Sequence, residues 1–495
     1  MNHVRRAISN NNLGRRHKMA KNKYTRLFEN TAIFTVGKFI SKLIVIFMLP
    51  FYTSCLSSAE YSTADLITNL CNLLIPLAGL GVSEGIFRGA AEKNQDKESF
   101  FTNGIILMLI GGAGFLVLSP LLFTIKYFSA YVWLIIAYVL ASNVHSVCSQ
   151  YICAIGRTKL FAGQGILNTA LTVGLNILFL AGFDMGITGY VLSIVLADTL
   201  TTVFLFFFAR LYKAFDSQKI SGALMGDMLK FCLPLVPSTI FWWITSVSDR
   251  YMVSAMRSDA ENGLYTAAYK IPTLLTYVVT IFNDAWKLSA VSEGEDLTEK
   301  TNFYSKAFKY YIAIMFMGGA GLAVTAGLSS KILFASSYET AWIFIPTLSA
   351  ATVFTALDTF MGSAYFTVKK TGMSFWTALV GAVLNLGLNL IMIPDWGLGW
   401  GAMGASIATL LSYFIVFVIR AVTMKRFIPF KLYPVKLILN TAMLVAITVI
   451  MTAWGDDLWG LLVSIAILLV CLVYNGRDIV LACKEILRSI RKKKA

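Results

Sequence analysis

Charged residues are scarce in this sequence. They make up 14% of its 495 residues, whereas hydrophobic residues make up 57%. A soluble globular domain carries about a quarter charged residues. This shortage excludes an ordinary soluble domain. Together with a mean hydropathy of +0.69, it indicates a protein that places most of its length in a lipid bilayer.

Clusters of metal-binding and phosphate-binding residues are also lacking. The three histidines are scattered, and the seven cysteines include no Cys-x-x-Cys pair. No Gly-rich phosphate-binding loop occurs, so the sequence gives no support for transport driven directly by ATP. We therefore expect no metal site, no disulfide framework and no cofactor.

The basic residues that are present give a formal net charge of +16. In a soluble protein this excess would suggest nucleic-acid binding. Here the basic residues lie mainly in short stretches between apolar segments and at both ends of the chain, a pattern typical of membrane topology. We therefore expect no nucleic-acid partner.

Fourteen segments are long and apolar enough to span a membrane, which takes ~20 residues. They predict an all-α, polytopic membrane protein without a soluble catalytic domain. The expected helices are 30–54, 61–87, 101–125, 129–155, 160–183, 186–209, 231–255, 262–290, 305–328, 340–367, 371–394, 398–419, 435–454 and 457–475.

The distribution of Lys and Arg between these segments predicts their orientation. With the N-terminus inside, the outer loops hold only Lys126, Arg257 and Lys331. The inner loops and the tail hold many more, so both termini are expected to be cytoplasmic. The inner set comprises Lys93, Lys97, Arg157, Lys159, Lys213, Lys219, Lys300, Lys369, Lys370, Lys425, Arg426, Lys431 and the basic residues of 477–494.

An internal repeat divides the chain. Residues 174–179 (GLNILF) recur as 387–392 (GLNLIM), and the same offset of 213 carries Gly186 onto Gly399. Parallel repeats of this kind are typical of transporters, with the substrate path at the interface between the halves. The expected order is a basic segment (1–26), a six-helix half (27–210), a cytoplasmic linker (211–230), a second half (231–420), two added helices (421–476) and a basic tail (477–495).

Charges inside the expected helices concentrate in the first two helices of each half. Such charges are costly in a bilayer and mark functional sites. Lys38 and Lys42 share one face of the first helix, and a polar stripe runs from Thr266 to Lys287. We expect these helices to line one hydrated cavity whose candidate substrate-binding residues are Lys38, Lys42, Arg88, Arg250, Lys270 and Lys287.

Several of these residues have structural alternatives. Arg88 and Lys287 could reach the headgroups from the helix ends, and Asp249 beside Arg250 could form an ion pair with a neighbouring helix. His145, Asp198 and Asp358 stand as lone polar groups in apolar segments. The candidates for H⁺ or Na⁺ coupling are Asp65, Asp284 and Asp358.

Two segments carry a family resemblance: GLGVSEGIFRGAAE at 79–92 and SDRYMVSAM at 248–256. With the six-plus-six repeat and the two added helices, the chain resembles the polysaccharide-transport flippases of the multidrug/oligosaccharidyl-lipid/polysaccharide exporter superfamily. The resemblance implies transport of an undecaprenyl-diphosphate-linked oligosaccharide across a bacterial cytoplasmic membrane by alternating access. It also implies contact with membrane lipids, and a polysaccharide polymerase or glycosyltransferases as partners. Cations suit a diphosphate headgroup.

Three other functions remain open at this stage. A lipid II-type flippase shares the helix count and the cationic cavity. A multidrug/cation antiporter would need acidic residues to dominate, and here basic residues lead. A membrane polysaccharide polymerase or ligase would need a sizeable outer loop, and the longest outer segment, 328–340, lacks an acid–base set. We therefore expect a transporter and no enzyme.

The topology can be tested with reporter fusions. A fusion after Ala495 should read cytoplasmic and one within 255–260 should read external, because the K/R bias places the two points on opposite sides. A C-terminal fusion that reads external would contradict the even number of crossings.

Overall fold

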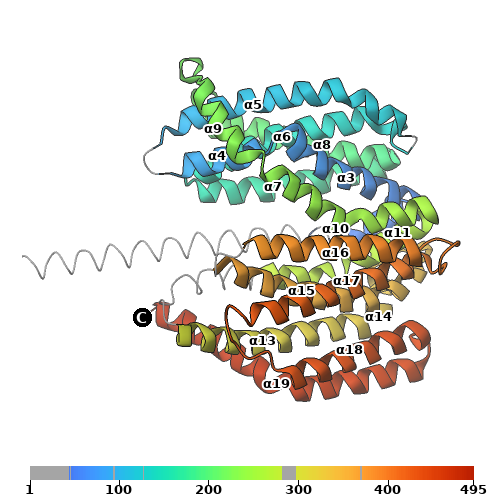
Figure 1. The fold of residues 1–495 in the computed structure, drawn as a ribbon. Coiled ribbons are helices and arrows are strands. Elements are labelled where there is room, and N and C mark those ends of the chain that lie inside the picture. The colour runs from blue at the N-terminus through green and yellow to red at the C-terminus, as the bar shows by residue number, and fades with distance from the viewer. Residues whose placement is uncertain are drawn as a thin grey trace, which may run out of the picture. The chain divides into compact units, whose positions relative to one another are not determined.

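Helices make up all the regular secondary structure of the described residues (Figure 1). The computed structural model describes residues 44, 46–92, 95–125, 127–280, 297–367 and 371–494. An all-helical architecture is expected for a chain in lipid, because each helix satisfies its own backbone hydrogen bonds. The all-α class predicted from the sequence is confirmed.

Within the described residues, 11 helical segments are long and apolar enough to cross a membrane. The bent pair α3 (Ser58–Ala78) and α4 (Val82–Ala91), with 57° between them, would be a twelfth. The polytopic membrane fold is therefore confirmed. The count of fourteen stays a prediction, because most of the expected helix 30–54 and the last third of 262–290 lie outside the described residues.

The chain separates into two compact units. Unit 1 is built on residues 71–237, and its core gathers Ile86, Phe101, Ile152 and Leu205. Helix α4 packs against α5, α6 and α9, and α8 packs against α6 and α7. Besides α4, its helices are α5 (Lys97–Leu118), η1 (Ser119–Thr124), η2 (Ser129–Tyr131), α6 (Val132–Ala154), α7 (Thr158–Asn176), η3 (Ile177–Gly182), α8 (Gly186–Phe208), η4 (Leu211–Lys213), η5 (Ser217–Lys219) and α9 (Gly222–Cys232).

Unit 2 contains residues 46–70 and 238–495. Its core centres on Phe308, Tyr311, Leu357 and Phe360, where α13, α15 and α17 meet. Helices α18 and α19 lie side by side and pack on α13 (Figure 1). Besides the start of α3, its helices are α2 (Leu49–Cys55), α10 (Leu235–Met256), α11 (Asp259–Lys270), α13 (Leu297–Val324), α14 (Ala326–Leu333), η6 (Ser336–Phe344), α15 (Ile345–Thr367), α16 (Thr371–Met392), α17 (Gly401–Met424), α18 (Pro434–Trp454) and α19 (Leu458–Lys494).

Three of the helices expected from the sequence are interrupted. The expected helix 61–87 is interrupted at Gly81, whose left-handed backbone (φ 65°) separates α3 from α4. Helices α9 and α10 divide the expected helix 231–255 at Leu233–Pro234. The polar stripe is interrupted by a turn at Ile271–Pro272, because proline lacks the N–H that would continue α11.

The repeat has a local physical basis in its turns. Gly186 opens α8 with a φ of 51°, and Gly399, its match at the offset of 213, has a φ of 69° just before α17. Backbone in this left-handed region favours glycine because it carries no Cβ atom. The repeated glycine therefore marks the same kind of turn before a helix in each half of the sequence.

Residues 211–221, the start of the expected linker, are held against the N-terminal end of α5. The buried Asn103 amide donates to the Lys219 carbonyl (2.9 Å), and its oxygen accepts from the Ser221 N–H (2.8 Å). The Lys219 ammonium lies 3.1 Å from Asp96 and 2.5 Å from Glu98. Its hydrogen bond to Asp96 holds the pKa of that exposed carboxyl below its usual value.

Replacing Asn103 should loosen this linker. Asn103→Ala leaves the Ser221 N–H and the Lys219 carbonyl without their side-chain partner, at a cost of about 1–3 kcal/mol. We expect a lower unfolding temperature in detergent and faster proteolysis within 211–221. Gln218→Ala removes an exposed amide from the same segment and is the matched control. Equal proteolysis of the two variants would contradict the anchoring role.

Candidate functional site

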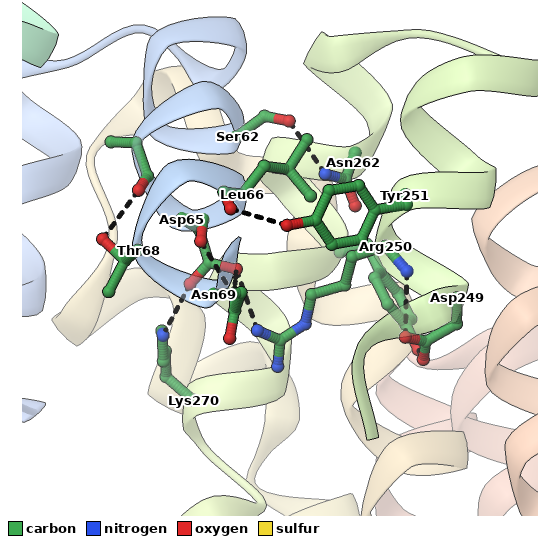
Figure 2. A network of polar contacts seen from close by, with 12 residues as sticks. Ser62, Asp65, Leu66, Thr68, Asn69, Asp249, Arg250, Tyr251, Asn262 and Lys270 are labelled. Atoms are coloured by element: carbon green, nitrogen blue, oxygen red, sulfur yellow. Dashed lines mark hydrogen bonds and ion pairs between the residues drawn. The ribbon is translucent and has the colours of Figure 1, made fainter. Parts of the chain in front are cut away.

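The carboxylate of Asp65 lies at the centre of a buried polar network in unit 2 (Figure 2). Its Oδ2 accepts from Arg250 Nη1 at 2.8 Å and from Asn69 Nδ2 at 2.7 Å. Its Oδ1 accepts from Lys270 Nζ at 3.0 Å. One carboxylate therefore holds two cations that come from two other helices, α10 and α11.

Local sequence explains how these groups reach one point. Asn69 follows Asp65 by four residues, so both lie on one face of α3. Helix α11 begins at the Ser258 cap, whose hydroxyl accepts from the Glu261 N–H (3.1 Å). It ends at Lys270, beside the turn at Pro272, where a cation also meets the negative end of the helix dipole.

Direct contacts fix α3 against α10 and α11. The Trp243 indole donates to the Asn69 carbonyl and the Tyr251 hydroxyl to the Leu66 carbonyl, both at 2.7 Å. A side chain at Gly263 would come within 1.8 Å of the Ser58 carbonyl oxygen, so only glycine allows this close approach. The ion pairs are thus formed between helices whose spacing is already set.

A second carboxylate balances the charge of the network. Asp249 accepts from the Arg250 backbone N–H (2.9 Å) and from the Tyr265 hydroxyl (2.5 Å). The Arg250 guanidinium also lies over the Tyr269 ring, 5.0 Å from its centre. Two cations and two carboxylates therefore form a neutral set.

The two cations, Arg250 and Lys270, differ in how far their side chains are exposed to solvent. The side chain of Arg250 is 10% exposed and that of Asp65 is 8% exposed, whereas Lys270 is 28% exposed. The buried Nε–H of Arg250 has no hydrogen-bond acceptor among the described residues. Lys270 is thus the cation that a ligand can reach, while Arg250 anchors Asp65 from the buried side.

A second buried ion pair lies beside a cavity of about 550 Å³ in unit 2. Arg420 Nη1 lies 3.1 Å from Asp358 Oδ1, and Arg420 also donates to the Thr377 hydroxyl (2.8 Å) and the Ser374 carbonyl (3.2 Å). Aromatic rings and hydroxyl groups share the cavity wall, which includes Phe241, Thr245, Ser246, Thr355, Thr359, Phe375, Asn385, Ser412 and Tyr413.

The structure brings together three of the residues that the sequence singled out: Asp65, Arg250 and Lys270. Arg88 lies in unit 1, exposed, with its guanidinium 4.2 Å from the centre of the Phe231 ring. Lys38, Lys42, Asp284 and Lys287 lie outside the described residues. Among the described residues, no group of three or more His, Cys, Asp and Glu could hold a metal ion.

The view of His145, Asp198 and Asp358 as lone polar groups is wrong. His145 Nδ1 lies 3.4 Å from Asp198 Oδ1, and Ser142 and Asn168 also donate to that carboxylate. Asp358 is paired with Arg420. These partners come from other helices or other turns of a helix, which a search along the chain does not connect.

Arg420 itself was missed in the sequence. The expected helix 398–419 ends one residue before this arginine, whereas α17 runs on to Met424 and buries it. The apolar residues on both sides of Arg420 were the signal that could have identified it.

The fold and these buried ion pairs define a polytopic membrane transporter. The family described as polysaccharide biosynthesis protein matches residues 27–287, more than half of the chain. The chain belongs to this family, which confirms the resemblance that the sequence showed.

Among curated proteins, the chain is similar to a probable low-salt glycan biosynthesis flippase, Agl15, of Haloferax volcanii. The two are 23% identical over 232 residues, which cover 44% of this chain and 47% of that protein. The chain thus matches about half the length of this curated relative.

Solved structures of the MOP superfamily share the fold. An inward-facing multidrug resistance MATE family transporter has a TM-score of 0.62 at 15% identity, over 79% of this chain and 98% of that one. A transporter from Pyrococcus furiosus, reported with a binding pocket of reversed polarity, has a TM-score of 0.55 at 15% identity, over 80% and 96%.

Removing the shared carboxylate should cost more stability than removing one cation. Asp65→Asn leaves the buried Arg250 without its acidic partner from α3, and breaking a buried pair in this way costs about 3–5 kcal/mol. Lys270→Gln keeps the Asp65–Arg250 pair and should cost less. Unfolding temperatures of the purified variants in one detergent check this order. Equal losses would contradict the central place of Asp65.

Proposed function

We propose that this protein is a flippase that moves a lipid-linked oligosaccharide, carried on undecaprenyl diphosphate, from the inner to the outer leaflet of a bacterial cytoplasmic membrane by alternating access. The observation that carries the proposal is the Asp65 network, with two cations held inside membrane helices. Membership of the polysaccharide biosynthesis family supports the substrate class.

The diphosphate competes with Asp65 for Lys270. Phosphate oxygens accept strong charge-assisted hydrogen bonds, as a carboxylate does. Among the described residues, the Lys270 ammonium pairs with one carboxylate, Asp65, and its side chain is the more exposed, so it can exchange one anion for the other with a small movement. Lys38, Lys42, Arg88, Arg250 and Lys287 are proposed to contribute positive charge to the same path.

Cation coupling acts on the same carboxylate in this scheme. A proton or Na⁺ on Asp65 removes or offsets its negative charge, which frees Lys270 for the diphosphate. Loss of the ion restores the pair and releases the substrate. Asp358, beside Arg420, and Asp284 are further candidates for this role.

The cavity beside Asp358 suits part of the glycan. Sugar rings present hydroxyl groups at their edges and C–H groups on their faces, which match hydroxyl and aromatic walls respectively. Phe241 and Phe375, with ring centres 5.8 Å apart, supply the aromatic part, and Thr355 and Ser374 supply polar groups. Glycosyltransferases and a polymerase are the proposed partners before and after transport.

The proposal predicts that Lys270 acts through its charge. Delivery of lipid-linked glycan to the outer leaflet should fall about tenfold or more in Lys270→Gln, since a hydrogen bond to a charged group contributes about 1.5–3 kcal/mol. Lys270→Arg should retain most of it. Lys331→Gln, which removes an exposed lysine from α14, is the matched control. All variants are compared at equal amounts of folded protein.

Two outcomes would contradict the scheme. Full delivery by a Lys38/Lys42/Lys270 triple Gln variant would show that these cations are structural and that the substrate path lies elsewhere. Delivery in vesicles that is indifferent to both H⁺ and Na⁺ gradients would remove the coupling role of Asp65, Asp284 and Asp358 while leaving the substrate site in place.

A further inference from the structure

A basic pocket of about 500 Å³ lies where α13, α18 and α19 meet in unit 2. It falls outside residues 27–287, which the family match covers, and it shares no lining residue with the Asp65 network. The residues that line it are Lys309, Tyr433, Pro434, Val435, Lys436, Tyr474, Arg477 and Asp478.

The pocket holds more positive charge than its one carboxylate balances. Asp478 accepts from Lys436 Nζ at 2.5 Å and lies 2.9 Å from Lys309 Nζ. Lys436 and Asp478 are buried, whereas Lys309 is 38% exposed. Arg477 is exposed and has no ion-pair partner among the described residues. The set of three cations and one carboxylate leaves two positive charges on the open side.

The packing of α18 on α19 does not require the two positive charges that the carboxylate leaves unbalanced. The buried Lys436–Asp478 pair already links α18 to α19 as a neutral unit. Lys309 and Arg477 add charge at the mouth of the pocket, where a purely structural pair would gain little. An anion that approaches from outside would find both groups within reach, with the two tyrosine side chains beside them.

Exposed apolar side chains border the pocket. Val435, Ile438 and Val473, on the same two helices, are exposed, Val473 by 83%. A neighbouring recess adds Lys425 and Lys431 in the loop before α18, which the Lys and Arg distribution predicts to be cytoplasmic. Cations beside an exposed apolar wall at a membrane boundary match a phosphate headgroup with its acyl chains.

We propose that this pocket binds the phosphate of an anionic glycerophospholipid of the inner leaflet. Lys309 and Arg477 hold the phosphate oxygens, and the buried Lys436 adds positive charge from deeper in the pocket. The acyl chains lie along Val435, Ile438 and Val473. The lipid would bridge α13 to the two C-terminal helices and stabilise their packing. This role does not depend on which substrate the protein carries.

Lipid-dependent thermal stability tests the site in the full-length protein in detergent. Added phosphatidylglycerol should raise the unfolding temperature of the wild type by several degrees, because a ligand that binds only the folded state stabilises it. The Lys309→Gln/Arg477→Gln variant should lose this rise. Lys309→Arg/Arg477→Lys, which keeps both charges, should retain it. Lys213→Gln/Lys331→Gln removes two exposed lysines elsewhere and should also retain it.

Other results would overturn the proposal. An equal rise with phosphatidylcholine would show a general effect of acyl chains. An equal rise with glycerol phosphate or inorganic phosphate would assign the pocket to a soluble anion. A wild type that does not respond to phosphatidylglycerol, or a control double variant that loses the response as fully as Lys309→Gln/Arg477→Gln, would remove the site.

Discussion

The pairing of buried charges with opposite charges, which the described residues show at Asp65, Asp358 and Asp478, is the constraint on which this structure depends. An ion that enters a bilayer loses its hydration shell, so it needs a partner of opposite charge in the protein. Asp65 supplies that partner for Arg250 and Lys270. The contacts between α3, α10 and α11, including the close approach at Gly263, hold the three charges at hydrogen-bond distance.

The same solution recurs in two other places in unit 2. Asp358 on α15 is paired with Arg420 on α17, and Asp478 on α19 is paired with Lys436 on α18. In each case the partners come from different helices, so each pair also specifies which helices pack together. Asp65 and Asp478 each contact two cations. The Asp65 network differs because it contains a second carboxylate, Asp249, which accepts from Arg250 only through the backbone N–H.

The sequence was sufficient to predict the helices and the residues with buried charge, but not the pairs. Hydropathy alone predicted an all-helical membrane fold, because a span needs a long apolar run. Asp65, Arg250 and Lys270 stood out as charges in such runs. Their meeting depends on tertiary packing across about 200 residues of sequence, which no local period encodes. A single sequence therefore identified the charges and left their partners open.

The exact positions of helix breaks are hard to predict for a related reason. Gly81 and Pro272 were visible in the sequence, yet a membrane helix often tolerates glycine and proline. Here Gly81, with its left-handed backbone, lies in the turn between α3 and α4. Pro272 lies in the turn that follows the end of α11 at Lys270. The break at Pro272 places Lys270 at a helix end, where its side chain is freer to turn than it would be within a continuous helix.

A network of this kind suits transport because the cost of burying its charges and their mutual attraction are of similar size. Burying two cations and two carboxylates costs desolvation free energy that their attraction roughly offsets. In the proposed scheme, a second anion therefore replaces Asp65 at small net cost. Arg250 and Lys270 differ in their access to solvent. In the proposed scheme, the less exposed arginine keeps Asp65 in position and the more exposed lysine changes partners. An equally buried pair of cations would lock the carboxylate, and an equally exposed pair would leave it hydrated. In the proposed scheme, the asymmetry between Arg250 and Lys270 is the feature that allows one site both to hold an anion and to release it.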